Sequence, residues 1–104
     1  MAEERTGQRT QTIGTSSTVV SRLQPYAQRV LFVLTNTSTS GQTITLAFNQ
    51  DAVAGSGIVL SPGGFYSEAQ DAGFLPTNMD IYGIASAGGA TLAITERVTR
   101  KEVL

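Results

Sequence analysis

The side chains in this sequence that could perform chemistry are mostly carboxylates. Two carboxylates that converge across a cleft can hydrolyse a glycosidic bond, and a group of them can bind Ca²⁺ through oxygen ligands. The acids in or beside predicted loops are Asp51, Glu68, Asp71 and Asp80. Their spacing matches no template for either chemistry, so we interpret them as solvated loop charges, with a structural Ca²⁺ as the main alternative.

The residue types that most catalytic sites need are missing. The sequence has no histidine and no cysteine, which excludes Ser-His-Asp and Cys-His constellations, disulfides and thiolate metal sites. Lys101 is the one lysine and stands near the C-terminal end, where a buried catalytic amine is not expected. We therefore predict a protein that is not an enzyme, with no catalytic, cofactor-binding or metal-binding residues.

Two further groups of residues have a chemical and a structural interpretation. The glycines of Gly55-Ser-Gly57 and Gly63-Gly64 lack the Lys-Ser/Thr that follows in a phosphate-binding loop, so we interpret both stretches as turns. An aromatic platform for sugars could be built from Phe65, Tyr66, Phe74 and Tyr82. Because sugar platforms usually use tryptophan and the sequence has none, packing at the core edge or at an interface is the favoured interpretation.

Composition limits the partners. Charged residues make up 14% of the chain, against about 25% in an average domain, and the net charge is −1. No Lys/Arg-rich block supplies the basic face that phosphates require, so nucleic acid is not the predicted partner. No segment approaches the ~18 apolar residues of a membrane span, and the first residues form no apolar signal region. We expect a protein that is made and used in soluble form.

The elements that would position these residues are short strands. Residues 29–36 form a continuous apolar run that indicates a central strand covered on both faces. The next run, residues 43–48, alternates apolar and polar side chains, and the two runs together predict a β-hairpin. Short strands are also predicted at residues 58–60 and 65–70. Residues 79–85 and 90–96 flank Ser86-Ala-Gly-Gly89 and predict a second hairpin.

Strands at this spacing predict an all-β fold, an antiparallel β-sandwich of the jelly-roll type. The polar residues 1–22 predict an extended N-terminal arm, in which a strand begins near Gln11; residues 23–97 form the sandwich domain and residues 98–104 a C-terminal tail. The predicted core residues are Val30, Phe32, Leu34, Ile44, Leu46, Phe48, Ile58, Leu60, Ile81, Ile84, Leu92 and Ile94. A core of this size is marginal for an isolated domain, which favours an oligomer.

The order of these segments resembles small β-sandwich structural proteins of tailed bacteriophages. A strand that ends in Asn36 is followed by Ile44-Thr-Leu-Ala-Phe48, by the turn sequence Gly57-Ile-Val-Leu-Ser-Pro-Gly-Gly64 and by two closing strands. The closing strands are Ile81-Tyr-Gly-Ile-Ala85 and Ala90-Thr-Leu-Ala-Ile-Thr-Glu96. The likeness extends over about residues 28–97.

The resemblance implies a virion protein at the capsid surface, made in the host cytoplasm. It would act as a capsid decoration or cement protein that binds the outside of the shell, and the alternative is a tail or fibre module that binds a receptor or carbohydrate. Its partners would be other copies of itself, with a trimer favoured, and the major capsid protein. We expect the arm and tail to make these contacts through Arg5, Arg9, Ile13, Val19, Val20, Arg22, Arg97 and Arg100.

Overall fold

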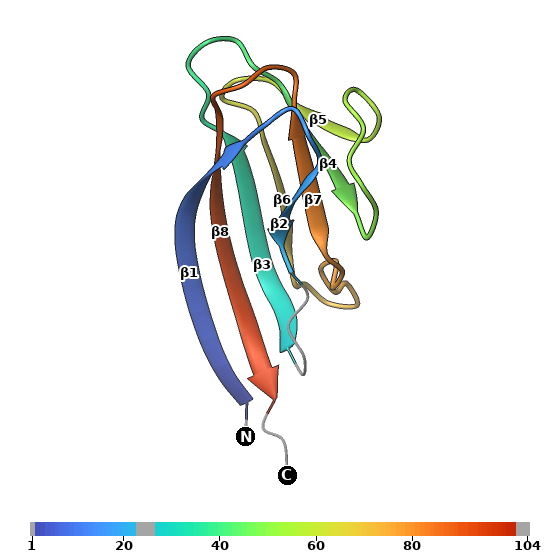
Figure 1. Ribbon diagram of the computed structural model, residues 1–104. Helices are drawn as coiled ribbons and strands as arrows, with labels where there is room; N and C mark the ends of the chain where they lie inside the picture. The colour runs from blue at the N-terminus through green and yellow to red at the C-terminus, as the bar shows by residue number, and fades with distance from the viewer. Residues whose placement is uncertain (1, 23–26, 102–104) are drawn as a thin grey trace.

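The computed structural model describes residues 2–22 and 27–101, and within these ranges the chain contains strands and no helix. Figure 1 shows two layers of strands. The strands are β1 (Ala2–Ile13), β2 (Thr18–Ser21), β3 (Ala27–Asn36), β4 (Ile44–Phe48), β5 (Ile58–Leu60), β6 (Phe65–Ala69), β7 (Ile81–Ala85) and β8 (Ala90–Lys101). The predicted all-β class is therefore confirmed.

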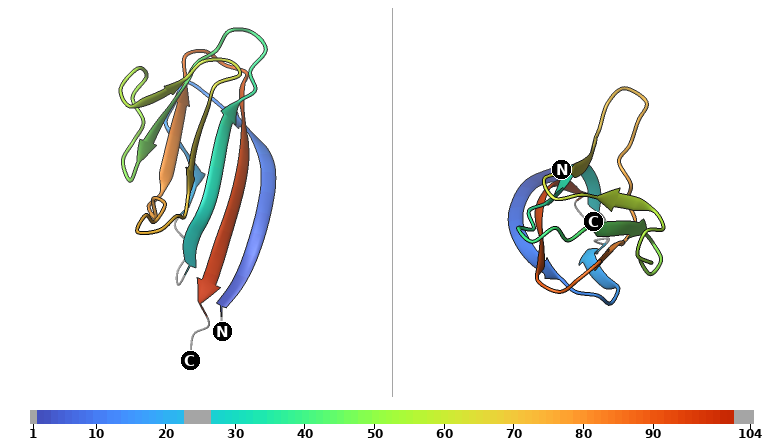
Figure 2. Two further views of the ribbon diagram at one scale, coloured as in Figure 1. Left: turned by 180° about the vertical axis from the view of Figure 1, so that it is seen from behind. Right: turned by 90° about the horizontal axis from the view of Figure 1, so that it is seen from above.

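The strands form two four-stranded antiparallel sheets. The first sheet has the order β1-β8-β3-β6 and the second has the order β2-β7-β4-β5. Every connection except β4–β5 passes from one sheet to the other, which is the strand arrangement of a jelly roll. The same layers appear from behind and from above in Figure 2. The predicted antiparallel sandwich is thus the observed architecture.

Both predicted hairpins are wrong. β3 and β4 follow each other in sequence but lie in different sheets, and so do β7 and β8. The one hairpin of consecutive strands is β4–β5, in which Ile44 pairs with Leu60. The alternation of apolar and polar residues shows which side chains point to the core. The same alternation is expected whether the next strand pairs in the same sheet or lies in the facing sheet, so it could not distinguish a hairpin from a crossing between sheets.

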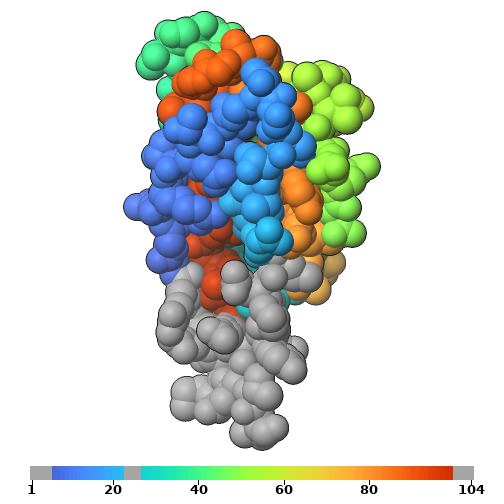
Figure 3. All heavy atoms as spheres, viewed as in Figure 1, coloured from blue at the N-terminus to red at the C-terminus, as the bar shows by residue number. Residues whose placement is uncertain are grey.

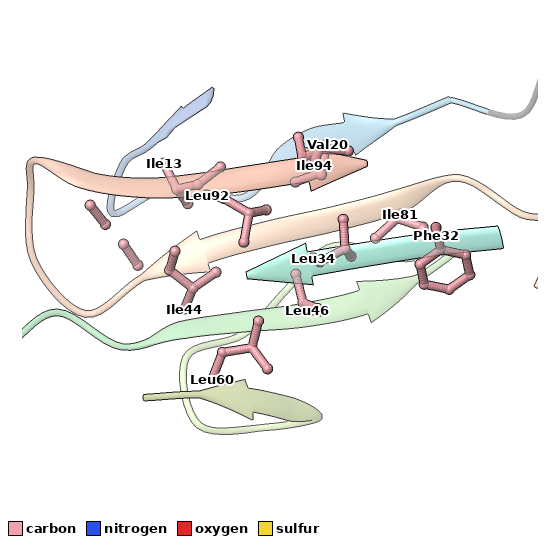
Figure 4. Close-up of a cluster of buried hydrophobic side chains, with 12 residues drawn as sticks. Ile13, Val20, Phe32, Leu34, Ile44, Leu46, Leu60, Ile81, Leu92 and Ile94 are labelled. Carbon is pink, nitrogen blue, oxygen red and sulfur yellow. The ribbon is translucent and has the colours of Figure 1, made fainter. Parts of the chain in front are cut away.

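The core fills the space between the sheets. The buried cluster consists of Ile13, Val20, Phe32, Leu34, Ile44, Leu46, Leu60, Ile81, Ala85, Ala90, Leu92 and Ile94, and Figure 4 shows its larger members pointing toward one another from both layers. The ring of Phe32 lies 6.5 Å from that of Phe48 and 6.0 Å from that of Tyr66. Each large side chain contributes about 1.5–3 kcal/mol on full burial.

Four predicted core residues are not in this cluster. Phe48 and Ile58 are partly buried and pack against it, whereas Val30 and Ile84 lie outside it. Val30 is only half-buried because a β-bulge between Arg29 and Leu31 turns Arg29 inward in its place. Ile84 is also half-buried, because Ile81 points inward and a strand alternates every two residues, so a residue three positions later points outward.

Residues 1–22 do not form a free arm over their described part. β1 pairs with β8 without interruption, from Ala2 opposite Lys101 to Ile13 opposite Ala90. β2 pairs with β7 in the second sheet. The predicted tail likewise begins inside β8, which continues to Lys101, and residues 102–104 lie outside the described residues. The predicted boundaries of arm and tail are therefore corrected: both segments contribute strands to the sandwich.

One end of the sandwich, here called the loop end, carries connections 14–17, 37–43, 61–64 and 86–89, none of which contains a charged residue. Asn36 is fully buried there. Its Nδ2 donates to the carbonyls of Gln42 at 2.8 Å and Leu60 at 2.9 Å, and its Oδ1 accepts from the N–H of Ser38 at 2.9 Å. The Nε2 of Gln42 donates in turn to the carbonyl of Gly88 at 3.0 Å. Two neutral amides thus join connection 37–43 to the end of β5 and to connection 86–89.

Candidate functional site

The outer side of the first sheet is a broad surface with little charge. The strand register places outward side chains in rows across β1, β8, β3 and β6. The rows are Thr10, Ala93, Thr35 and Phe65; Gln8, Thr95, Val33 and Ser67; and Thr6, Arg97, Leu31 and Ala69. We call these twelve residues the open face. Arg97 is its one charged residue, and its Nε donates to Thr6 Oγ1 at 3.1 Å.

The apolar part of the open face lies over β3 and β6. Leu31 and Val33 are half-buried, and Phe65 keeps 64% of its surface exposed. β3 lies between β8 and β6, as predicted for a central strand. The apolar run of β3 predicted cover on both faces, yet among the described residues the chain covers only the inner one. Because apolar side chains that gather on an outer surface are a feature of interaction sites, the open face is the candidate functional surface.

The outer side of the second sheet differs because the chain covers part of it. Residues 49–57, which connect β4 to β5, fold back over β4. There the N–H of Gly55 donates to Thr45 Oγ1 at 3.0 Å and the N–H of Ala52 donates to Ser17 Oγ at 2.8 Å. Thr45 is 2% exposed and Ala52 is 4% exposed. Gly57 allows this close approach, because a Cβ at that position would lie 2.7 Å from the carbonyl oxygen of Leu46.

The predicted contact residues do not form one surface. Ile13 and Val20 are in the core and are unavailable to a partner, which corrects their assignment. The half-buried Val19 accepts a hydrogen bond at its carbonyl from Gln11 Nε2 at 3.1 Å. Arg97 lies on the open face, as described above, whereas Arg9 and Arg22 lie at the end opposite the loop end. The side chains of Arg5 and Arg100 lie outside the described part of the chain.

A buried ion pair holds the end opposite the loop end, here called the charged end. Arg29 is 3% exposed, and its Nε donates to Glu96 Oε2 at 3.1 Å. Its Nη1 donates to the carbonyls of Thr77 at 3.0 Å and Met79 at 2.6 Å. Its Nη2 donates to Ser21 Oγ at 2.7 Å and to the Ser21 carbonyl at 3.3 Å. All five N–H groups of the guanidinium are thus used within the chain.

Glu96 is equally occupied. Its Oε1 accepts from Arg9 Nη1 at 3.1 Å and its Oε2 accepts from Ser21 Oγ at 2.5 Å in addition to Arg29. Burial would raise the pKa of Glu96, but the hydrogen bonds from Ser21, Arg29 and Arg9 outweigh it and hold the pKa below its usual range. A cavity of about 420 Å³ opens beside this cluster. The buried charges of Arg29 and Glu96 are already paired with each other, so this cluster is suited to joining strands.

The four candidate carboxylates are spread over β6 and two connections. Asp51 is exposed in the β4–β5 connection, and Asp71 is exposed at the start of the β6–β7 connection. Asp80 precedes β7, with an oxygen 3.9 Å from Arg22 Nη1. Glu68 points inward from β6. Within residues 2–22 and 27–101 no three acidic residues gather as a metal site would require.

Glu68 is held by its neighbours. Its Oε1 accepts from the N–H of Thr77 at 2.7 Å, and its Oε2 accepts from the Tyr66 hydroxyl. Burial alone would raise the pKa of Glu68, but these bonds and the charge of Arg29 lower it. Burial, together with the bond to Glu68 and its charge, raises the pKa of Tyr66 to about 12. Glu68, positioned by Tyr66, thus links β6 by a hydrogen bond to the connection that leads to β7.

The four candidate aromatic residues do not share a platform. Tyr66 points into the core and contacts Phe32 and Phe48. Phe65 lies on the open face, Tyr82 faces outward from the second sheet, and Phe74 is 47% exposed in the β6–β7 connection. This arrangement agrees with core-edge and surface packing rather than with a sugar-binding surface built from all four.

Sequence reasoning missed the Arg29–Glu96 pair and the open face. A signal for the pair was present, because Arg29 begins an apolar run and Glu96 ends an alternating strand, so both are charges at core-facing ends of strands. The open face had a partial signal in the two-sided apolar character of β3. The extent of the open face depends on which strands pair with β3. The predicted hairpin assigned β3 the wrong neighbour, so the face could not be outlined from the sequence.

Comparison with known proteins extends the description of the fold. No known protein family and no curated protein matches the sequence. A solved structure described under the words "Bacillus endospore appendages form a novel family of disulfide-linked pili" is similar, with a TM-score of 0.59 at 14% identity. The match covers 98% of this chain and 89% of that one. At this identity the likeness shows the fold, and the linkage named there has no counterpart here because the sequence lacks cysteine.

The described residues contain no helix long and apolar enough to cross a membrane.

Proposed function

We propose that this chain is a structural protein without catalytic activity, which works by packing its open face against other protein copies. The observation behind the proposal is the contrast between the two outer sides of the sandwich. The chain covers the middle of the second sheet, around Thr45, with its own residues 49–57. The first sheet presents Leu31, Val33 and Phe65 with no comparable cover from the described chain. A partner packed on this face would remove these apolar side chains from water.

The finer proposal is a capsid decoration or cement protein, in which the partners are other copies of the chain and a major capsid protein. It is supported by the resemblance to phage sandwich proteins and by the jelly-roll strand order, an arrangement that recurs in viral capsid domains. This support is an analogy at the level of the fold. The surface chemistry agrees with it, since a nearly uncharged open face suits association with another protein.

The test places one charge on each outer side of the sandwich. We expect Val33→Lys to disrupt assembly because it sets an ammonium in the middle of the open face, while Val59→Lys, on the 46% exposed Val59 of β5, is the matched control. Sedimentation velocity over a concentration series measures the outcome. Higher-order assembly of the wild type and of Val59→Lys, with smaller species for Val33→Lys, is the expected result.

Two outcomes would contradict the proposal. One is a wild-type chain that shows no higher-order species at any concentration. The other is Val33→Lys assembling as well as Val59→Lys. For the finer proposal, labelled wild-type chain should sediment with capsid particles and the Val33→Lys variant should not.

A further inference from the structure

The free edge of β1 presents backbone groups that no strand of the described chain uses. The N–H of Thr37 donates to the carbonyl of Thr91 at 3.0 Å, so odd-numbered residues of β8 point their backbone groups at β3 and even-numbered ones point theirs at β1. By the register, Gly7, Arg9 and Gln11 then bond to β8. The N–H and C=O groups directed to the open edge belong to Thr6, Gln8, Thr10 and Thr12.

The other three sheet edges carry protection that β1 lacks. β2 has four residues and a bulge between Val19 and Ser21, and the Val20 carbonyl accepts a bond from Arg9 Nη2 at 2.7 Å. β5 has three residues and β6 has five. Short strands, bulges and charges are the usual means of keeping an edge from pairing with another chain.

β1 is neither short nor bulged, and the one charge among its described side chains, Arg9, bonds within the chain to Glu96 and the Val20 carbonyl. It runs for twelve residues in unbroken register and contains no proline, and the side chains at its open-edge positions from Thr6 to Thr12 are exposed and uncharged. Figure 3 shows β1 (blue) at the margin of the molecule. Such an edge is a template for strand addition.

We infer that β1 pairs antiparallel with β1 of a second copy of this chain across a two-fold axis, which joins the two first sheets into one continuous sheet. This inference deepens the proposed function by naming a partner and a contact. A two-fold contact is self-complementary, so the same edge serves both copies and the pairing closes at a dimer. This pairing of β1 with β1 requires no change in the β1–β8 register, because it uses only those backbone groups of β1 that do not bond to β8.

Charge and the length of strand that can pair select the register. A pairing centred on Arg9 would place Arg9 directly opposite Arg9 of the second copy, and like charges in that position destabilise a sheet. A pairing centred on Gln8 avoids this. Gln8 then faces Gln8 of the second copy, Thr6 faces Thr10, and Arg9 faces Gly7, which has no side chain. The Gln8-centred register also pairs nearly all of β1, residues 3–13, whereas a register centred on Thr10 would pair only residues 7–13. The Gln8-centred register is therefore the one we propose.

The dimer would also enlarge the surface proposed for packing. A two-fold axis perpendicular to the sheet keeps the outer sides of both copies on the same side. The open faces of the two copies would then meet along Thr6, Gln8 and Thr10. The result is one wide surface, and among the twelve open-face residues of each copy Arg97 is the one with a charge.

The experiment uses the absence of cysteine in the sequence, since every disulfide must come from an introduced residue. Directly opposed residues in such a pair have Cα atoms about 5.5 Å apart, within the range of a disulfide. We expect Gln8→Cys to form a disulfide dimer on mild oxidation. The Thr6→Cys and Thr10→Cys variants should cross-link with each other when they are mixed. Each variant oxidised by itself should give only a trace of dimer. Non-reducing electrophoresis and mass spectrometry identify the products.

Matched variants separate this pairing from other contacts. Ser67→Cys, at the β6 edge, is the control and should stay monomeric on oxidation. Thr10→Pro removes an N–H that points to the open edge while the bonds to β8 remain, so it should retain the far-ultraviolet circular dichroism of the wild type and lose the dimer.

Three results would overturn the inference. The first is cross-linking of Ser67→Cys in place of Gln8→Cys, and the second is cross-linking of Thr6→Cys with Gln8→Cys instead of with Thr10→Cys. The third is a dimer that is unchanged in Thr10→Pro. Failure here and failure of the proposed function are distinguishable. A Val33→Lys variant that keeps the Gln8→Cys cross-link but loses larger assemblies supports both. Loss of the cross-link alone removes the β1 pairing and leaves the open face as proposed.

Discussion

The two ends of the sandwich hold their connections by different chemistry. At the loop end the buried amide of Asn36 bonds to backbone groups of three other residues, and the connections it joins contain no charge. At the charged end the guanidinium of Arg29 reaches Glu96, Ser21 and the connection before β7. Both residues lie on β3, Asn36 at its last position and Arg29 near its first. One strand thus anchors both ends.

The difference concerns what each anchor depends on. A neutral amide that bonds to carbonyls keeps its strength over a wide range of pH, because no partner titrates there. An ion pair depends on the carboxylate remaining charged, and removing one partner leaves a buried charge alone. We therefore expect the charged end to be the more sensitive to mutation and to acid.

The largest effect should come from Arg29→Ala. The variant leaves Glu96 largely buried without its main cation and should lower the free energy of unfolding by about 3–5 kcal/mol. Arg22→Ala is the control, since Arg22 is exposed and an exposed ion pair contributes about 1 kcal/mol or less. Urea denaturation measures both. The double variant Arg29→Met, Glu96→Leu should recover part of the loss, and equal effects of Arg29→Ala and Arg22→Ala would refute the assigned role.

A smaller effect is expected from Asn36→Ala. The change leaves the buried carbonyls of Gln42 and Leu60 without this donor, which should cost about 1–3 kcal/mol in urea denaturation. Asn78→Ala is the matched control, because Asn78 is half-buried and donates one bond, to the Ala27 carbonyl at 3.2 Å. If Asn36→Ala were no more damaging than Asn78→Ala, the loop end would not depend on its amide.

The smallest effect is a difference in pH dependence. The pKa of Glu96 is lowered in the folded chain, so its stabilisation is present above the unfolded value of about 4.3 and is lost as pH falls through the folded pKa. Wild type and Asn36→Ala should therefore lose stability in parallel as pH falls below about 5. Glu96→Gln should show a shallower loss, with the remainder due to Glu68, whose pKa is also lowered. Unfolding curves at several pH values test this, and an unchanged slope in Glu96→Gln would contradict it.

The sequence was sufficient to predict the sandwich class and most of the inward-facing residues. Strands such as β4 alternate cleanly, so Ile44, Leu46 and Phe48 could be assigned to the core before the structure was known. It was not sufficient to predict which strands lie beside each other, because a jelly roll passes most connections between sheets. The bulge at Arg29 was also hidden, since it shifts the alternation by one residue without a glycine or proline to mark it.

The candidate surface was harder to predict than the core. A polar sequence with few apolar residues suggested that residues 1–22 extend freely, yet β1 gains its order from β8, far away in the chain. Side chains such as Thr10 and Ala93 become parts of one surface only through that pairing. The sequence of either segment alone does not indicate this pairing, because the two segments share no motif.

The pairing of β1 with β8 has a consequence for how the chain acquires its structure. The nearest paired residues of the two strands are Ile13 and Ala90, so almost the whole chain must be synthesised before β1 has its neighbour. Until then β1 has two unpaired edges and Ile13 has no place in a closed core. Non-local pairing of this kind slows folding. We expect the first strand to remain protease-sensitive on ribosome-bound chains until β8 has left the exit tunnel.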